Sequence, residues 1–195
     1  MPERFIALSE ADRRDALELA AAQSGRPAQL LEKDVWVVWT LAVLFDSSLG
    51  DNLVFKGGTS LSKAYQAIRR FSEDLDITLD IRELMPDLVP ASSDGIPATR
   101  SQAGKWVREA RSRLPDWIAI ALIPRLQAAI DIDRLDMSLR QDGDSVQVPY
   151  APVVPGSSYV RPAVTLEFGA RSTGEPWVRR PASCDASPLW ARIVR

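Results

Sequence analysis

The residues best suited to chemistry lie in the segment 55–77, which reads FKGGTSLSKAY and then, after a short gap, RRFSEDLDI. Gly57 and Gly58 lack a Cβ atom, so the backbone of a turn there can approach a phosphate closely. The hydroxyl groups of Thr59 and Ser60, with the exposed amides of the helix that follows, suit an anion. The segment therefore predicts a phosphate-binding turn between a strand and a helix.

The second half of this segment carries two carboxylates. Asp74 and Asp76 belong to the strictly alternating stretch DLDITL, which predicts a strand with both side chains on one face. Such carboxylates can share hard cations such as Mg²⁺, and two ions could bridge a nucleoside triphosphate and an attacking hydroxyl. Taken alone, a Gly-Gly pair is an ordinary turn and an Asp-x-Asp is a solvated strand edge. Their order, with one short helix between them, favours nucleotide transfer, and neither the P-loop nor the dinucleotide-binding pattern is present.

The composition excludes several classes of active site. The chain has 195 residues, no histidine and one cysteine, Cys184, so catalytic triads, His-ligated zinc and disulfide frameworks are excluded. The net charge of −2 is no signature of general nucleic-acid binding. The N-terminus lacks the apolar core of a signal peptide, and the longest apolar stretch, residues 35–45, is shorter than the ~20 residues of a membrane helix. We therefore expect a soluble, cytoplasmic protein with no membrane partner.

Hydrophobic periodicity and chain breakers indicate the elements that position these residues. Ser9 is a candidate N-cap, Pro115 and Pro124 are expected to break a long helix, and Trp36 and Trp39 are expected in the core. The expected helices cover residues 9–23, 30–45, 61–68 and 104–130, residues 82–104 are expected to form a loop, and the expected strands cover 53–55, 74–79 and two segments after residue 146. This order predicts an α/β (α+β) fold with a small mixed sheet flanked by helices.

On these residues the chain resembles a known family. KGGTSLSKAY followed by RFSEDLDI is similar to the Gly-Gly/Ser…Asp-x-Asp signature of the DNA polymerase β-like nucleotidyltransferases. It resembles more closely the AbiEii/AbiGii toxins of bacterial type IV toxin–antitoxin and phage-defence systems, whose N-terminal helix the segment EKDVWVVWTLAVLF also resembles. The resemblance covers about residues 30–80 and is looser for PAVTLEFGAR. It implies a nucleotidyltransferase-like fold, Mg²⁺, an NTP substrate, an RNA acceptor such as a tRNA 3′ end, and a separately encoded antitoxin.

The resemblance also implies roles for individual residues. It makes Asp74 and Asp76 metal ligands, with Glu167 in VTLEFG as the candidate third carboxylate; alternatively, Glu167 lies on the polar side of an ordinary strand. Lys63 could reach a phosphate or lie solvated on an exposed helix face, and the pair Arg69–Arg70 could contact nucleotide or be surface charge. The implied nucleotide-binding residues are Gly57, Gly58, Thr59, Ser60, Lys63, Arg69 and Ser72.

Several alternatives stay open at this point. The family normally continues into a helical half with a lysine-containing motif, and nothing after Arg171 resembles it. We therefore expect residues 1–195 to form the catalytic domain, either truncated or as a shortened member with altered activity. A nucleotidyltransferase acting on a small molecule such as an antibiotic, or a catalytically impaired binding module, would carry the same pattern. A second Asp-x-Asp, Asp131 to Asp133, follows no glycine turn and is expected to be surface charge, and Asp142-Gly143-Asp144 is expected to be a turn.

Overall fold

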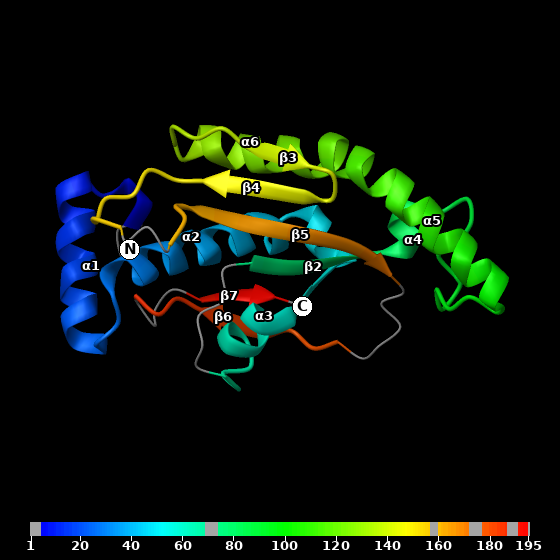
Figure 1. Cartoon of the computed structure of the whole chain (residues 1–195), viewed down its shortest axis with the longest axis horizontal. Helices are drawn as coiled ribbons and strands as arrows, with labels where there is room; N and C mark the ends of the chain where they lie inside the picture. Colours follow the sequence, from blue (N-terminus) through cyan, green and yellow to red (C-terminus); the bar gives the residue numbers. More distant parts are fainter. Residues whose placement is uncertain (1–4, 69–73, 157–159, 172–176, 187–190, 195) are drawn as a thin grey trace.

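The computed structural model describes residues 5–68, 74–156, 160–171, 177–186 and, as backbone, 191–194 (Figure 1). Its centre is a five-stranded sheet with the order β1-β2-β5-β4-β3. β2 and β5 pair in parallel and the other neighbours pair antiparallel, so the predicted α/β fold with a small mixed sheet is confirmed. The strands are β1 (Leu53–Lys56), β2 (Asp74–Asp80), β3 (Arg140–Asp142), β4 (Ser145–Pro149) and β5 (Ala163–Arg171).

Helices flank this sheet. α2 runs behind the sheet in Figure 1, α5 and α6 follow its upper edge, and α3 and the small β6–β7 ribbon lie below β2 in this view. Trp36 and Trp39 of α2 are buried in the core, as predicted. The helices are α1 (Glu10–Ser24), α2 (Ala28–Phe45), α3 (Gly57–Lys63), α4 (Ile81–Leu84), α5 (Arg100–Trp117) and α6 (Ile123–Ile132), with short 3₁₀ turns at Phe5–Ala7 and Ser48–Asn52.

The first two helices follow the sequence closely. Ser9 caps α1, and its side chain accepts a hydrogen bond from the Asp12 amide at 3.2 Å. Gly25 ends α1 with φ 70°, a conformation that glycine adopts without a steric penalty. α2 is buried on nearly every side, as its continuous apolar stretch predicts.

The helix predicted at 61–68 is placed wrongly, because α3 begins at Gly57 itself and ends at Lys63. Gln66 adopts a positive φ of 52°, and the Ala67 amide donates to the Leu61 carbonyl at 2.9 Å, a pattern that terminates a helix. Leu61 and Tyr65, which suggested a buried face, are 44% and 47% exposed. The glycines therefore form the first turn of the helix.

The prediction that the prolines break the helix after Gly104 is wrong for Pro115, which lies inside α5. The α-helix is interrupted before Pro124, because a π-helical turn, Ile118–Leu122, precedes α6 and Pro124 lies in the first turn of α6. A proline removes one amide donor and crowds the preceding turn, and the wider spacing of a π-turn accommodates this change at Pro124. The loop expected at residues 82–104 is shorter in the structure, because α4 (Ile81–Leu84) occupies its first residues and α5, which starts at Arg100, occupies its last.

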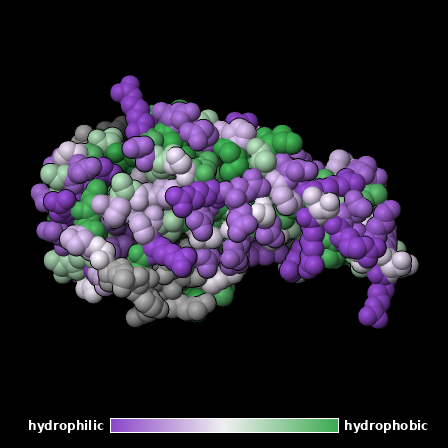
Figure 2. Space-filling model, turned by 45° about the horizontal axis from the view of Figure 1, so that its top comes forward, coloured by the Kyte–Doolittle hydropathy of each residue, from purple (hydrophilic) through white to green (hydrophobic). Residues whose placement is uncertain are grey.

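The polar region after Arg171 contains strands that the sequence reading did not predict. β6 (Arg180–Ser183) and β7 (Ala191–Val194) pair antiparallel in a separate two-stranded sheet, and β7 lies against α2. In the described ranges, no helix combines the length and apolarity needed to cross a bilayer. Figure 2 shows a face on which hydrophilic residues predominate, with apolar residues between them.

Candidate active site

The pleat of β2 separates core residues from candidate site residues. Leu75, Ile77 and Leu79 point into the core and are at most 2% exposed. Asp74 and Asp76 therefore lie on the opposite face, as the alternation predicted. Asp76 pairs with Lys56 on β1 and with Glu167 on β5. Since paired residues in neighbouring strands share a face, the structure brings Asp74, Asp76 and Glu167 to one surface of the sheet.

The glycine turn touches this surface directly. Gly57 adopts φ +74°, a conformation that L side chains rarely take. A Cβ atom added there would overlap Asp76 Oδ2 and lie 2.6 Å from Asp76 Cγ. Gly57 is therefore required both for its backbone conformation and for the space that the Asp76 carboxylate occupies. The turn at Gly57 is therefore packed directly against a carboxylate of β2.

Thr59 joins the turn to the carboxylate strand. Its side chain is buried, and Thr59 Oγ1 donates a hydrogen bond of 2.6 Å to the Asp74 carbonyl oxygen. Ser60 is 5% exposed and lies in the first turns of α3 with Gly58 and Thr59. The hydroxyl proton of Thr59 is thus used to fix the start of β2 against α3.

Glu167 lies within electrostatic range of the other carboxylates. Its pKa is raised, first by loss of solvation and then by the negative charges of Asp74, Asp76 and Asp144. Asp144 belongs to the turn between β3 and β4, where a turn was predicted, and its carbonyl oxygen accepts from the Phe168 amide at 3.0 Å. The sequence reading did not connect Asp144 with the site, because the antiparallel pairing of β4 with β5 brings it there.

These carboxylates are not gathered into a cation site. Within the part of the chain that the structure describes, no group of three or more Asp, Glu, His or Cys residues is arranged to hold a metal ion. The donor chemistry nevertheless fits a hard divalent cation, because carboxylate oxygens are the ligands that Mg²⁺ prefers. The negative charges of the neighbouring aspartates help to raise the pKa of Glu167, and a bound cation would reduce this repulsion between the carboxylates.

Lys63 lies in a buried ion-pair cluster. Its side chain is 6% exposed, and Nζ pairs with Asp34 of α2 and, at 2.8 Å, with Asp185 Oδ2. Burial raises the pKa of Asp34, against the opposing effect of the Lys63 charge. Lys63 is therefore not solvated on an exposed helix face, and its ammonium links the end of α3 to α2 and to the segment before β7.

The Glu-Lys-Asp start of the second helix is buried as well. Glu32 Oε1 accepts from the Val153 amide at 2.7 Å, and Lys33 Nζ donates to the Arg161 carbonyl at 3.2 Å. Asp34 Oδ2 accepts from the Asp185 amide at 2.5 Å. All three charged residues thus bind segments that lie more than a hundred residues further along the chain.

The remaining predicted residues are placed as follows. Arg69 and Ser72, with Arg70, lie outside the described residues. Asp133 Oδ2 accepts a hydrogen bond of 2.8 Å from Trp39 Nε1, and Asp131 Oδ1 accepts from Gln127 at 2.9 Å. Asp131 is exposed, as expected for surface charge, whereas Asp133 is half-buried and is bound to α2.

Comparison with known proteins identifies the family of the chain. No curated protein and no solved structure matched the chain. A family model described as "Nucleotidyl transferase AbiEii toxin, Type IV TA system" matches residues 39–193, which include the glycine turn, the carboxylate strands and the β6–β7 ribbon. The match extends beyond residue 80 toward the C-terminus, and it begins at Trp39, so it does not include the Glu-Lys-Asp start at residues 32–34. The chain therefore belongs to the AbiEii family of nucleotidyltransferase toxins of type IV toxin–antitoxin systems.

Proposed function

We propose that the protein transfers a nucleotide from an NTP to a hydroxyl of an RNA acceptor, the 3′ end of a tRNA, and acts in the cytoplasm. The acceptor oxygen forms a bond to the α-phosphorus, the bond from that phosphorus to the bridging oxygen breaks, and pyrophosphate leaves. The hydroxyl proton passes to a base. The observation that carries this proposal is the contact between Gly57 and Asp76, which joins a phosphate-approach turn to a carboxylate face.

The residues of the glycine turn and of the carboxylate face have different proposed roles. The backbone at Gly57 and Gly58 approaches the triphosphate, and Thr59 holds the turn in register with β2. Asp74, Asp76 and Glu167 would hold Mg²⁺, which supplies charge neutralisation for the phosphates when bound. Ser60, Arg69 and Ser72 are proposed nucleotide contacts on the family resemblance.

Lys63 is proposed as a positioning residue. Its ammonium is paired with Asp34 and Asp185, and a buried pair of this kind is costly to separate. The pairing favours a role in fixing α3, whose first residues form the glycine turn, over direct contact with phosphate.

The family points to two further features of the biological setting. We propose that a separately encoded antitoxin controls the protein and that the pair serves in phage defence, with toxicity arising from blocked translation.

The test is a transfer assay. The purified chain is incubated with Mg²⁺, total bacterial tRNA and each of the four α-labelled NTPs separately, alongside Asp74→Asn, Asp76→Asn and the control Asp131→Asn. Asp131 is an exposed carboxylate on α6, so its replacement matches the change of charge without touching the sheet face. We expect RNase-sensitive label with the wild type and with Asp131→Asn, and a loss of at least a hundredfold with the other two variants.

Three results would contradict the proposal in different ways. RNase-resistant label on a small product would replace the RNA acceptor by a small molecule such as an antibiotic. Folded Asp74→Asn protein with unchanged transfer would remove the carboxylate face from the reaction. Absence of label with every NTP, together with partner binding that is insensitive to both aspartate variants, would indicate a binding module.

A further inference from the structure

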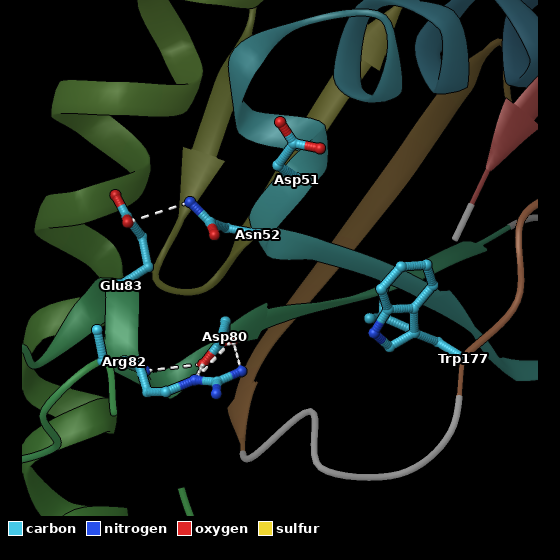
Figure 3. Close-up of a pocket in the computed structure, with 8 residues that line it drawn as sticks. Asp51, Asn52, Asp80, Arg82, Glu83 and Trp177 are labelled. Atoms are coloured by element: carbon cyan, nitrogen blue, oxygen red, sulfur yellow. Dashed lines mark hydrogen bonds and ion pairs between the residues drawn. The ribbon is translucent and has the colours of Figure 1, made fainter. Parts of the chain in front are cut away.

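A polar pocket lies at the end of β2 that is remote from Asp74. It has a volume of about 380 Å³ and forms where β2 ends, α4 begins and β1 starts (Figure 3). Figure 3 shows Asp80 and Arg82 along one side of the pocket, Asp51 and Asn52 along another, and Trp177 facing them from a segment distant in sequence. The lining residues are Asp51, Asn52, Val54, Asp80, Arg82, Glu83, Ala91 and Trp177.

This pocket lies on the same face of the sheet as the candidate active site. Asp80 is four residues beyond Asp76 on β2, so the alternation of the strand places both side chains on one face. Val54 of β1 is on that face too, because it pairs with Thr78. At roughly 3.3 Å per residue, Asp76 and Asp80 are about 13 Å apart along the strand. That separation is comparable to the length of an extended nucleotide.

The lining combines an indole with carboxylates. Trp177 is 42% exposed and contributes its indole to the lining. Asn52 Nδ2 donates to Glu83 Oε2 at 3.1 Å, which holds this amide–carboxylate pair in one orientation. Among the lining residues the acidic side chains outnumber the single cation, Arg82, which is itself bound to Asp80 through Nε at 2.9 and 3.0 Å. Outside the lining, Arg179 Nη2 lies 3.7 Å from Asp51 Oδ1, so the carboxylate of Glu83, which is paired with an uncharged amide, carries the excess negative charge.

These features select the chemistry of the ligand. A site with excess negative charge disfavours phosphate and attracts N–H donors. An aromatic side chain offers a stacking surface to any base. Adenine, cytosine and guanine each carry an exocyclic amino group that can donate to a carboxylate, whereas uracil presents carbonyl oxygens in its place.

We propose that this pocket binds a nucleobase bearing an exocyclic amino group, stacked on Trp177 and donating to the Asn52–Glu83 pair, while the phosphates of the same substrate lie toward Gly57 and Asp76. The proposal rests on the proposed function, in which those phosphates belong to an NTP or to the terminal nucleotide of the acceptor. The residues that select the base would then lie near Asp80, four residues along β2 from Asp76, where the reacting phosphate binds.

The first measurement is independent of transfer. Binding of adenosine, cytidine, guanosine and uridine to the full chain is measured by calorimetry, with Trp177→Ala, Glu83→Gln and the control Val178→Ala. Val178 is 49% exposed and adjacent to Trp177, but it does not line the pocket. We expect at least one of the amino-bearing nucleosides to bind more tightly than uridine. Trp177→Ala should weaken that binding about tenfold, since a stacked base is worth about 1–3 kcal/mol.

The second measurement identifies the source of the base. An increased KM for the NTP with Trp177→Ala, and a changed preference among NTPs, assigns the pocket to the incoming nucleotide. An increased KM for tRNA with unchanged NTP preference assigns it to the acceptor. The proposal is overturned if nucleoside binding and both KM values are the same in Trp177→Ala, Glu83→Gln and wild type. If the nucleoside pattern appears and no transfer is found, the pocket assignment stands and the proposed function fails.

Discussion

Replacing Gly57 by alanine tests the contact on which the site assignment depends. The positive φ of 74° costs a non-glycine residue about 1 kcal/mol or slightly more. The new Cβ would also overlap the Asp76 carboxylate, with Cγ at 2.6 Å and Asp76 Cβ at 3.0 Å, so the aspartate has to rotate or the turn has to shift. Overpacking of this kind costs about 1–3 kcal/mol. We therefore expect Gly57→Ala to lower the free energy of unfolding by about 2–4 kcal/mol.

The chain offers a matched control for the backbone term. Gly25 has φ +70°, and an added Cβ there would meet no atom within 4 Å. Gly25→Ala should therefore lose only the conformational cost of about 1 kcal/mol. The difference between the two variants, measured by urea unfolding at equilibrium, isolates the clash with Asp76. In an Asp76→Ala background, which removes Oδ2 and Cγ, the extra cost of Gly57→Ala should shrink.

The result that would refute this reasoning is equal destabilisation by Gly57→Ala and Gly25→Ala. The turn would then have room beside Asp76, and the Gly-Gly pair would be an ordinary turn. A second readout is nucleotide transfer, which should fall at least a hundredfold in Gly57→Ala and stay unchanged in Gly25→Ala, because the displaced carboxylate belongs to the proposed site.

Three further predictions concern the supports of the site. Thr59→Val removes the donor to the Asp74 carbonyl and should cost about 1–3 kcal/mol in urea unfolding, and an unchanged midpoint would show that this hydrogen bond does not hold the turn. Lys63→Met leaves Asp34 buried without its cation and should cost about 3–5 kcal/mol, whereas a stable variant with only an increased KM for the NTP would make Lys63 a phosphate ligand. Burial raises the pKa of Glu32 above its ordinary 4.5, so the folded state retains this proton longer than the unfolded state does. The stability of the wild type relative to Glu32→Gln should therefore fall as the pH rises from below 4.5 through the folded pKa, and a difference that grows with pH over that window would contradict the assignment.

Local pattern was sufficient to predict the carboxylate strand. The alternation of DLDITL directs Asp74 and Asp76 away from the core, and this pattern depends on β2 alone. The start of α3 was predicted wrongly because the prediction relied on the apolar spacing of Leu61 and Tyr65. Both side chains are exposed in the structure, and the sequence alone does not show which face a short helix buries. The relation of Glu167 to Asp76 depends on the parallel register of two strands that are far apart in the chain, so it entered from the family resemblance.

The pocket beside β2 could not be predicted from any one segment. Asn52 precedes β1, Glu83 lies in α4, and Trp177 precedes β6, and nothing in the local sequence of any of them specifies the other two. Glu83 also falls in the region that the prolines and serines indicated as a loop, where a four-residue helix capped by Asp80 forms instead. A site assembled from three distant segments is set by the fold, and it is visible only after the strands are placed.

The buried charges of α2 show why the later part of the chain matters to a turn at Gly57. Asp34 forms an ion pair with Lys63 at the end of α3 and accepts a hydrogen bond from the amide of Asp185. The side chain of Asp185 forms a second ion pair with Lys63. A buried carboxylate oxygen without a hydrogen-bond donor is costly, so the Asp185 amide that binds Asp34 helps α2 and α3 to keep their positions. α3 carries the glycine turn at its first residue, and Thr59 ties that helix to Asp74. The geometry of the proposed active site is therefore determined jointly by segments near residues 34, 63 and 185, and a deletion that removes residues 183–186 should destabilise the site, because it removes the amide bound to Asp34 and one of the two carboxylates bound to Lys63.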